Sequence, residues 1–240
     1  MSTNRIFLPL LAGTLMLAAC GPAEVEPADD LSPFPPVERP VSVTTAFQYS
    51  DEVSREGTGE AEKVLAALGV GPGDAVADIG AGRGFYMQKL ADAVGPDGRV
   101  YAQDIFPDVV SDLEVRASAN GYGNVRSVLG TPDDPGLPPD SLDHALLVHM
   151  YHEIGNPYAL LWHLRGSLKP DATIAVVDAD RITSQHGTPP DLLVCEVAAL
   201  GFEEMTREGL EEGVAYVAVF RQVAPRPEPQ DIVPCEGPDA

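Results

Sequence analysis

Basic residues are scarce in this sequence. Its 240 residues include 15 Lys and Arg against 37 Asp and Glu, so the formal net charge is −22 and the pI is near 4.3. Binding to a nucleic-acid backbone requires clustered Lys and Arg, and no basic patch occurs along the chain. The composition therefore argues against a nucleic-acid substrate, and no nucleic-acid partner is expected. Three cysteines are also too few for a small fold held together by disulfides.

Long apolar runs are absent as well. The apolar stretch at residues 6–19 is shorter than the ~20 residues that span a bilayer, and it has the size of a signal-peptide core. It ends in Leu-Ala-Ala-Cys20-Gly, which resembles a bacterial lipobox. We therefore expect residues 1–19 to be a lipoprotein signal peptide. The alternatives are an ordinary secretory signal with an incidental cysteine, and a short membrane anchor.

The lipobox implies a location for the chain. Cys20 would be lipidated and would be the only attachment to a bacterial membrane, in the cell envelope, with the domain on the periplasmic side. Proline-rich segments flank the domain: residues 20–42 have the composition of a tether, and residues 222–240 that of a tail in which prolines exclude a helix. Residues 43–221 have the length of one ordinary domain. Within it, residues 47–51 are expected to be a short entry segment.

A glycine-rich turn organises this domain. The apolar run at residues 75–79 ends in Gly80-Ala-Gly82-Arg-Gly84, and a segment with helical periodicity follows at residues 85–94. Glycine accepts positive φ and lets a ligand approach the backbone. A second apolar run ends at Asp104, which lies 20 residues beyond Gly84, and a carboxylate there can accept hydrogen bonds from both ribose hydroxyls. The spacing is G-x-G-x-G rather than the G-x-G-x-x-G of dinucleotide-binding folds.

Asp78-Ile-Gly-Ala-Gly-Arg-Gly together with Asp104 resembles the class I S-adenosylmethionine-dependent methyltransferases. The likeness extends over about residues 60–221. It implies that S-adenosylmethionine is the cofactor, that Asp78 supports its methionine amine, and that Asp104 holds its ribose. The cofactor-binding residues implied in this way are Asp78, Gly80, Ala81, Gly82, Gly84, Asp104 and Ile105.

Short apolar strands alternate with amphipathic helices, which predicts an α/β doubly wound, Rossmann-like sheet. Helices are expected at residues 59–68, 85–94, 108–120, 157–168 and 190–200. Strands are expected at residues 75–79, 99–104, 125–129, 141–149 and 173–178, from residue 201, and at residues 214–220. The resemblance adds that seven strands form a mostly parallel sheet in which an antiparallel strand seven is inserted between strands five and six.

Residues that could take part in catalysis follow the fourth predicted strand. In parallel sheets, ligands bind beyond the carboxyl ends of the strands, which places Gly80, Asp104, His149 and Asp178 along one rim. His149, Tyr151 and His152 are the candidates to remove a proton from the methyl acceptor or to orient it. His149, His152 and Glu153 also raise the question of a metal site, but no second cluster occurs at ligand spacing, so no metal is expected.

Two cysteines remain in the mature chain after Cys20. Because an exported chain meets an oxidising compartment, Cys195 and Cys235 are predicted to form a disulfide that joins the tail to the last helix.

The predicted function is methyl transfer from S-adenosylmethionine to an unidentified small molecule; the oligomeric state is left open. Export conflicts with this function, because the cofactor is made in the cytoplasm. Three possibilities stay open: an active envelope methyltransferase, an envelope binding module that reuses the fold without catalysis, and a cytoplasmic enzyme that is anchored by its N-terminus and whose signal is mispredicted.

Overall fold

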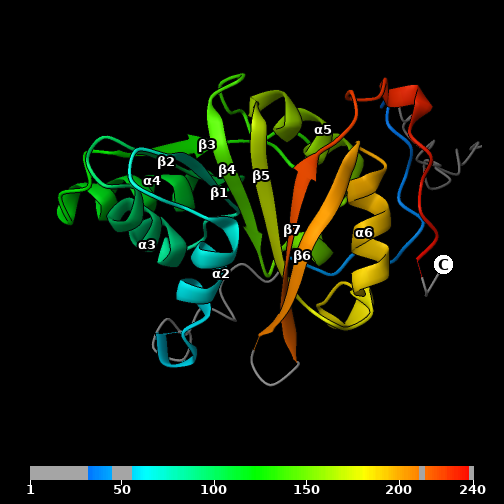
Figure 1. Cartoon of the computed structure of the whole chain (residues 1–240), viewed down its shortest axis with the longest axis horizontal. Coiled ribbons are helices and arrows are strands. Elements are labelled where there is room, and N and C mark those ends of the chain that lie inside the picture. Colours follow the sequence, from blue (N-terminus) through cyan, green and yellow to red (C-terminus); the bar gives the residue numbers. More distant parts are fainter. Residues whose placement is uncertain (1–31, 45–55, 211–213, 238–240) are drawn as a thin grey trace, which may run out of the picture. The chain divides into compact units, whose positions relative to one another are not determined.

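The computed structural model describes residues 32–44, 56–210 and 214–237 of the chain (Figure 1). The predicted signal peptide, Cys20 and the entry segment at residues 47–51 lie outside these residues. Within them, no helix combines the length and apolar character needed to cross a bilayer.

A seven-stranded mixed sheet forms the centre of the fold, in the order β3-β2-β1-β4-β5-β7-β6. The strands are β1 (Ala75–Ile79), β2 (Arg99–Asp104), β3 (Val125–Leu129), β4 (Leu142–Val148), β5 (Leu168–Ala179), β6 (Phe202–Leu210) and β7 (Ala215–Gln222). Strands β1 to β5 are parallel, and β7 is antiparallel to both β5 and β6. The predicted fold, including the inserted antiparallel strand, is confirmed.

Helices cover both faces of this sheet (Figure 1). α2 (Glu60–Leu68), α3 (Phe85–Val94) and α4 (Pro107–Ala119) pack on one face, and α5 (Pro157–Ser167) and α6 (Pro190–Ala198) on the other. Side chains alternate between the faces along each strand. In β1, Val76 therefore packs in the core on the side of α2, α3 and α4, while Ala77 and Ile79 pack in the core on the side of α5 and α6. Burial on both faces explains why the central strands are almost continuously apolar.

β5 begins five residues earlier than the sequence predicts. Pro170 indicates a turn after α5, but the chain enters the sheet directly at Leu168, which pairs with Leu142. The pairing shifts between Leu142 and His144, and proline is tolerated at such irregularities because they need no ladder hydrogen bond from it. The Lys169 ammonium group binds the Asp143 carboxylate at 2.7 Å and helps to hold this extension in place.

The proline-rich segment before the domain is not wholly a tether. Residues 33–42 lie on the compact unit that begins at Pro33, and the Phe34 ring packs into the core with only 9% of its surface exposed. Arg39 is buried, and its Nε donates a 2.8 Å hydrogen bond to the Glu196 carboxylate on α6. The low apolar content of the segment argues against a core of its own, but contacts with the domain, among them those of Phe34 and Arg39, attach it to the domain.

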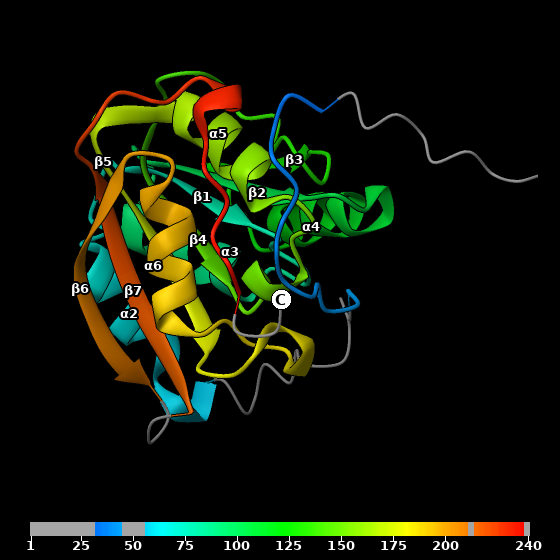
Figure 2. The ribbon, with the colours of Figure 1, turned by 90° about the vertical axis from the view of Figure 1, so that its right-hand side faces the viewer.

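The C-terminal segment is attached to the same helix. Cys195 on α6 and Cys235 form the predicted disulfide, with Cα atoms 6.1 Å apart. The indole of Trp162 donates a hydrogen bond to the Pro227 carbonyl, and a short 3₁₀ turn forms at Pro229–Asp231 despite the prolines. This segment runs beside residues 32–44 over α5 and α6 (Figure 2), and the two make a β-bridge between Glu38 and Glu236.

Candidate functional site

The glycine turn after β1 has the predicted backbone geometry, but its three glycines have different surroundings. All three have positive φ: 69° at Gly80, 53° at Gly82 and 82° at Gly84. A Cβ added at Gly84 would lie 2.8 Å from a methyl of Leu113, so this glycine is required for α3 to approach α4. A Cβ at Gly82 would meet nothing closer than a carbonyl oxygen at 4.0 Å. Gly82 is therefore the position where the backbone is open to a ligand.

Asp104 connects this turn to the loop after β2. Its side chain is almost fully buried, and its two oxygens accept hydrogen bonds from the amides of Gly82 and Phe106, each at 3.1 Å. A carboxylate has about four acceptor positions, so two backbone bonds leave capacity for further donors. The carboxylate thus fixes the two loops and can still accept hydrogen bonds from hydroxyl groups of a ligand.

A pocket lies beyond the carboxyl ends of β1, β2 and β4. Of the residues predicted to bind cofactor or act in catalysis, those that line it are Gly80, Ala81, Gly82, Asp104, Ile105 and His149. Asp78, Gly84, Tyr151 and His152 lie outside it. Further lining residues, which sequence reasoning did not assign to the cofactor, include Gln103, Phe106, Thr131, Met150, Glu153 and Ile154.

His149 is held at the pocket by a buried carboxylate. The residue has a positive φ of 53°, which is uncommon outside glycine, and its Nε2 lies 2.9 Å from Glu60 Oε2. The other Glu60 oxygen accepts a 2.9 Å hydrogen bond from the Tyr86 hydroxyl. A carboxylate only accepts hydrogen bonds, so we assign the hydrogen-bond donor to Nε2 of His149, which leaves Nδ1 for contact with a ligand. Histidine with an orienting carboxylate is a common arrangement for a general base.

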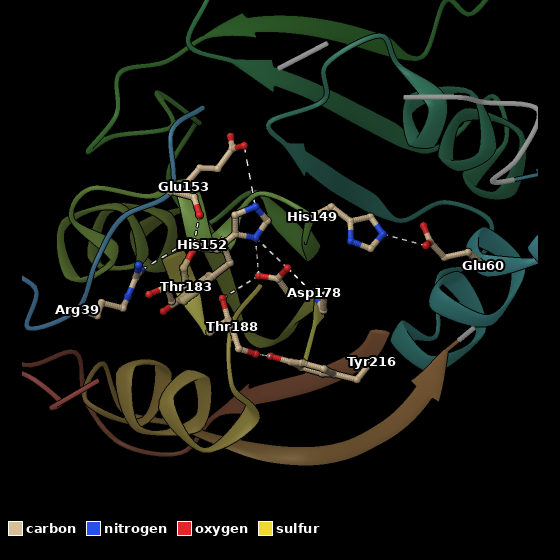
Figure 3. A network of polar contacts seen from close by, with 12 residues as sticks. Arg39, Glu60, His149, His152, Glu153, Asp178, Thr183, Thr188 and Tyr216 are labelled. Carbon is tan, nitrogen blue, oxygen red and sulfur yellow. Dashed lines mark hydrogen bonds and ion pairs between the residues drawn. The ribbon is translucent and has the colours of Figure 1, made fainter. Parts of the chain in front are cut away.

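His152 lies in a buried network next to the pocket (Figure 3). Its Nδ1 contacts both oxygens of Asp178 at 2.9 and 3.0 Å, and Asp178 is fully buried at the end of β5. The Thr188 hydroxyl donates to Asp178 at 2.7 Å, and the Tyr216 hydroxyl donates to the Thr188 carbonyl. Asp178 is therefore on the predicted rim but supports His152 rather than lining the pocket.

Tyr151, predicted as a catalytic candidate, is not among the residues that line the pocket. Its ring is fully buried beneath Arg39, with the guanidinium carbon 5.8 Å from the ring centre. Burial, and secondarily the nearby Glu196 carboxylate, raise the pKa of the Tyr151 hydroxyl well above its ordinary value. Tyr151, His152 and Glu153 form a 3₁₀ turn, in which successive side chains point in directions about 120° apart. Tyr151 consequently faces the core.

Parts of the chain are similar to known methyltransferases. Residues 77–176 match the family model described as a methyltransferase domain. Among curated relatives, a protein-L-isoaspartate O-methyltransferase from Aeropyrum pernix is 34% identical over 86 residues, which cover 36% of this chain and 33% of the relative. A demethylmenaquinone methyltransferase from Geobacillus kaustophilus is 25% identical over 122 residues, 51% of this chain and 52% of the relative. The chain thus spans about a third to a half of the length of these relatives.

Solved structures share the fold over more of the chain. A SAM-dependent methyltransferase from Aquifex aeolicus superposes with a TM-score of 0.65 at 24% identity, and the match covers 70% of this chain and 92% of that one. A possible exported protein from Bordetella parapertussis superposes with a TM-score of 0.57 at 13% identity, over 71% and 68% of the two chains. The chain therefore has the seven-stranded α/β fold found in S-adenosylmethionine-dependent methyltransferases, and residues 77–176 match the methyltransferase domain.

Proposed function

We propose that the protein transfers the methyl group of S-adenosylmethionine to a small-molecule acceptor. The observation that carries the proposal is the pocket beyond β1, β2 and β4, where Gly82 opens the backbone and the Asp104 carboxylate faces the same space. The match of residues 77–176 to the methyltransferase domain supports it. So do the methyltransferase relatives, although each is matched over only part of its length.

The residues present fit the cofactor. The space next to Gly82, which any Cβ would enter, accommodates a ligand against the backbone, and the remaining acceptor positions of Asp104 suit the two ribose hydroxyls. Bound S-adenosylmethionine supplies a methyl group on a positively charged sulfur, which a nucleophile displaces directly. The net charge of −22 and the buried carboxylates around the pocket favour a cationic ligand over an anionic one.

His149 is the general base of this proposal. Its Nδ1 would take the proton of an acceptor hydroxyl in the pocket, and that oxygen would then be the nucleophile toward the methyl group that S-adenosylmethionine would supply. Glu60 holds Nε2–H and stabilises the imidazolium that results. Tyr86 completes the support by donating to the second Glu60 oxygen.

Replacing Gly82 by alanine tests the cofactor site. The added methyl enters the space of the ligand, so we expect the affinity for S-adenosylmethionine, measured by calorimetry, to fall about tenfold or more. Gly69→Ala is the matched control, because Gly69 also has positive φ, at 80°, with nothing within 4 Å, but lies at the end of α2 outside the pocket. Equal affinities in the two variants, or no binding by the parent protein, would contradict the proposal.

We further propose that the protein is a lipoprotein of the cell envelope, attached to a membrane through Cys20. The lipobox supports this location, and so does the Cys195–Cys235 disulfide, because disulfides persist in oxidising compartments. We expect Cys20→Ser to abolish lipidation and to shift the protein out of the detergent phase in phase partitioning. Mass spectrometry of the mature N terminus provides the check: a parent protein without a lipid on Cys20 would contradict the location.

A further inference from the structure

Two histidines and a glutamate converge beside the proposed active site. His152 and Glu153 come from the 3₁₀ turn after β4, and His186 from the loop after β5, beyond the 3₁₀ turn at Thr183–Gln185. Their ligand atoms all lie within 4.8 Å of one another. His186 was missed at the sequence level because it is 33 residues from Glu153 and no motif surrounds it.

We propose that His152, Glu153 and His186 bind a divalent transition-metal ion of the Zn²⁺ type. Two imidazoles and one carboxylate are the donors of many catalytic metal sites, whereas Mg²⁺ and Ca²⁺ prefer oxygen donors alone. Tetrahedral Zn²⁺ with bonds of about 2.0–2.1 Å keeps its ligand atoms about 3.3 Å apart. The His152 Nε2 to Glu153 Oε1 distance is 3.9 Å and all the ligand atoms lie within 4.8 Å of one another, so the side chains would have to move closer together around an ion.

The Asp178 carboxylate bound to the far nitrogen of His152 favours a role as metal ligand for this histidine over an ordinary ion pair with Glu153. We assign Nδ1 of His152 as a donor to Asp178, so Nε2, which lies 3.9 Å from Glu153 in the cluster with His186, is the atom that would bind an ion. Asp178 is itself fixed by the Thr188 hydroxyl and the Ala179 amide. A carboxylate that orients a histidine through its second nitrogen is a recurrent feature of metal sites, where it sets the tautomer and strengthens the ligand.

His186 has a backbone conformation that directs it to the cluster. Its φ of 55° and ψ of 59° are left-handed, which is uncommon for a residue with a Cβ. Its ring meets the His152 ring edge-on, with centroids 5.5 Å apart. The His186 amide is held by the Thr183 carbonyl, and residues 32–44 secure the same loop, because the Ser42 hydroxyl donates to that carbonyl as well.

The position of the ion would matter for the reaction. Glu153 both belongs to the cluster and lines the pocket, so an ion on these ligands would lie at the pocket wall. Three protein ligands leave a coordination position for an oxygen or nitrogen atom of the acceptor, which the ion would orient and acidify. This last step rests on the proposed methyl transfer, whereas metal binding itself does not.

Calorimetry with ZnCl₂ on the full mature chain after EDTA treatment tests the site. We expect one equivalent to bind, a loss of about 100-fold or more in affinity for His186→Ala, and a loss of about 10- to 100-fold for Asp178→Asn, which leaves all three ligands in place. His163→Ala is the matched control, since His163 is on α5 outside the cluster, where its Nδ1 contacts the Asp133 and Ala159 carbonyls and its ring contacts Phe34 and Trp162. Its affinity should equal that of the parent.

A spectroscopic measurement keeps the test independent of folding. Co²⁺ in place of Zn²⁺ should give visible absorption bands of a low-symmetry, nitrogen-containing site in the parent and in His163→Ala, but not in His186→Ala. Circular dichroism identifies any variant that has failed to fold. No binding by the parent, or binding that His186→Ala and His163→Ala alter equally, would overturn the metal site. Binding of metal without binding of S-adenosylmethionine would leave the site standing and remove the proposed function.

Discussion

Replacing Arg39 by methionine is expected to lower the free energy of unfolding by about 3–5 kcal/mol. The Arg39 and Glu196 side chains are both fully buried and joined at 2.8 Å. Arg39 Nη2 also donates to the Tyr151 and Ile154 carbonyls at 3.5 and 3.4 Å, so removing the guanidinium leaves the Glu196 carboxylate without this cation and takes one donor from each carbonyl. An uncompensated buried charge costs far more than the net value of the pair. Urea unfolding followed by circular dichroism measures the loss.

The double variant Arg39→Met/Glu196→Leu is the control for this prediction. It removes both charges and fills the space with apolar side chains, so most of the loss should be recovered. If the double variant is as unstable as Arg39→Met, the loss comes from packing of residues 32–44 rather than from the stranded carboxylate.

The pH dependence of Arg39→Met adds a second readout. Burial raises the pKa of Glu196 above its ordinary value, while Arg39 opposes this shift. The folded chain therefore holds the Glu196 proton more tightly than the unfolded chain. The free energy of unfolding consequently falls as the pH rises from the ordinary pKa of a glutamate through the raised pKa of Glu196 in the folded chain. Without Arg39, nothing offsets this effect of burial, and the pKa of Glu196 should rise further. The loss of unfolding free energy in Arg39→Met, relative to the parent, should thus be smallest in mild acid and should grow toward neutral pH.

Replacing His149 by glutamine is expected to lower turnover about 10²- to 10⁴-fold with little change in the affinity for S-adenosylmethionine. Glutamine can still donate a hydrogen bond to Glu60, but it cannot take a proton from the acceptor. Turnover is measured as transfer of tritiated methyl groups to a panel of small hydroxylated acceptors, and cofactor affinity by calorimetry on the same preparations. A parallel loss of affinity would place His149 in the cofactor site instead.

Two further variants complete the His149 experiment. Glu60→Gln keeps the shape of the side chain that bonds His149 but removes its negative charge. Turnover should fall because the imidazolium form of His149 is no longer stabilised. His163→Gln changes a histidine that does not line the pocket and should match the parent. Full turnover in His149→Gln would mean that the acceptor loses its proton to another group or to water.

The parts of the site that the sequence predicts are those encoded by neighbouring residues. Gly80 and Gly82 follow β1 and Asp104 ends β2, two strands that are recognisable from their own composition, and the parallel sheet then brings these residues together. Asp104 turns out to have two roles, because its bonds to the Gly82 and Phe106 amides depend on how the loops fold.

The remaining features depend on tertiary structure. Glu60 is part of a helix that precedes β1 and in sequence looks like an ordinary acidic residue of a first turn, yet it holds His149. His186 reaches His152 from a distant loop. Tyr151 and His152 differ because neighbouring positions of a 3₁₀ turn face different surroundings, and sequence periodicity over three residues cannot assign those directions.

Residues 32–44 illustrate a different limit. Composition correctly indicates that this segment has too few apolar residues to fold alone. It does not reveal that a single ring, Phe34, and a single cation, Arg39, fit sites that the domain provides. Average composition describes what a segment can bury by itself, whereas attachment depends on individual complementary contacts.

Adjacent residues of α6 hold both segments that flank the sheet. Cys195 binds the later segment covalently and Glu196 binds the earlier one through Arg39, while Glu38 and Glu236 bridge the two. Fraying and proteolytic trimming ordinarily begin at the ends of a domain, where few contacts must open. Here neither the earlier nor the later segment can detach from the domain without breaking a covalent bond or exposing a buried charge. Local opening of the flanks is therefore coupled to the stability of α6, which protects the domain against gradual digestion from its ends.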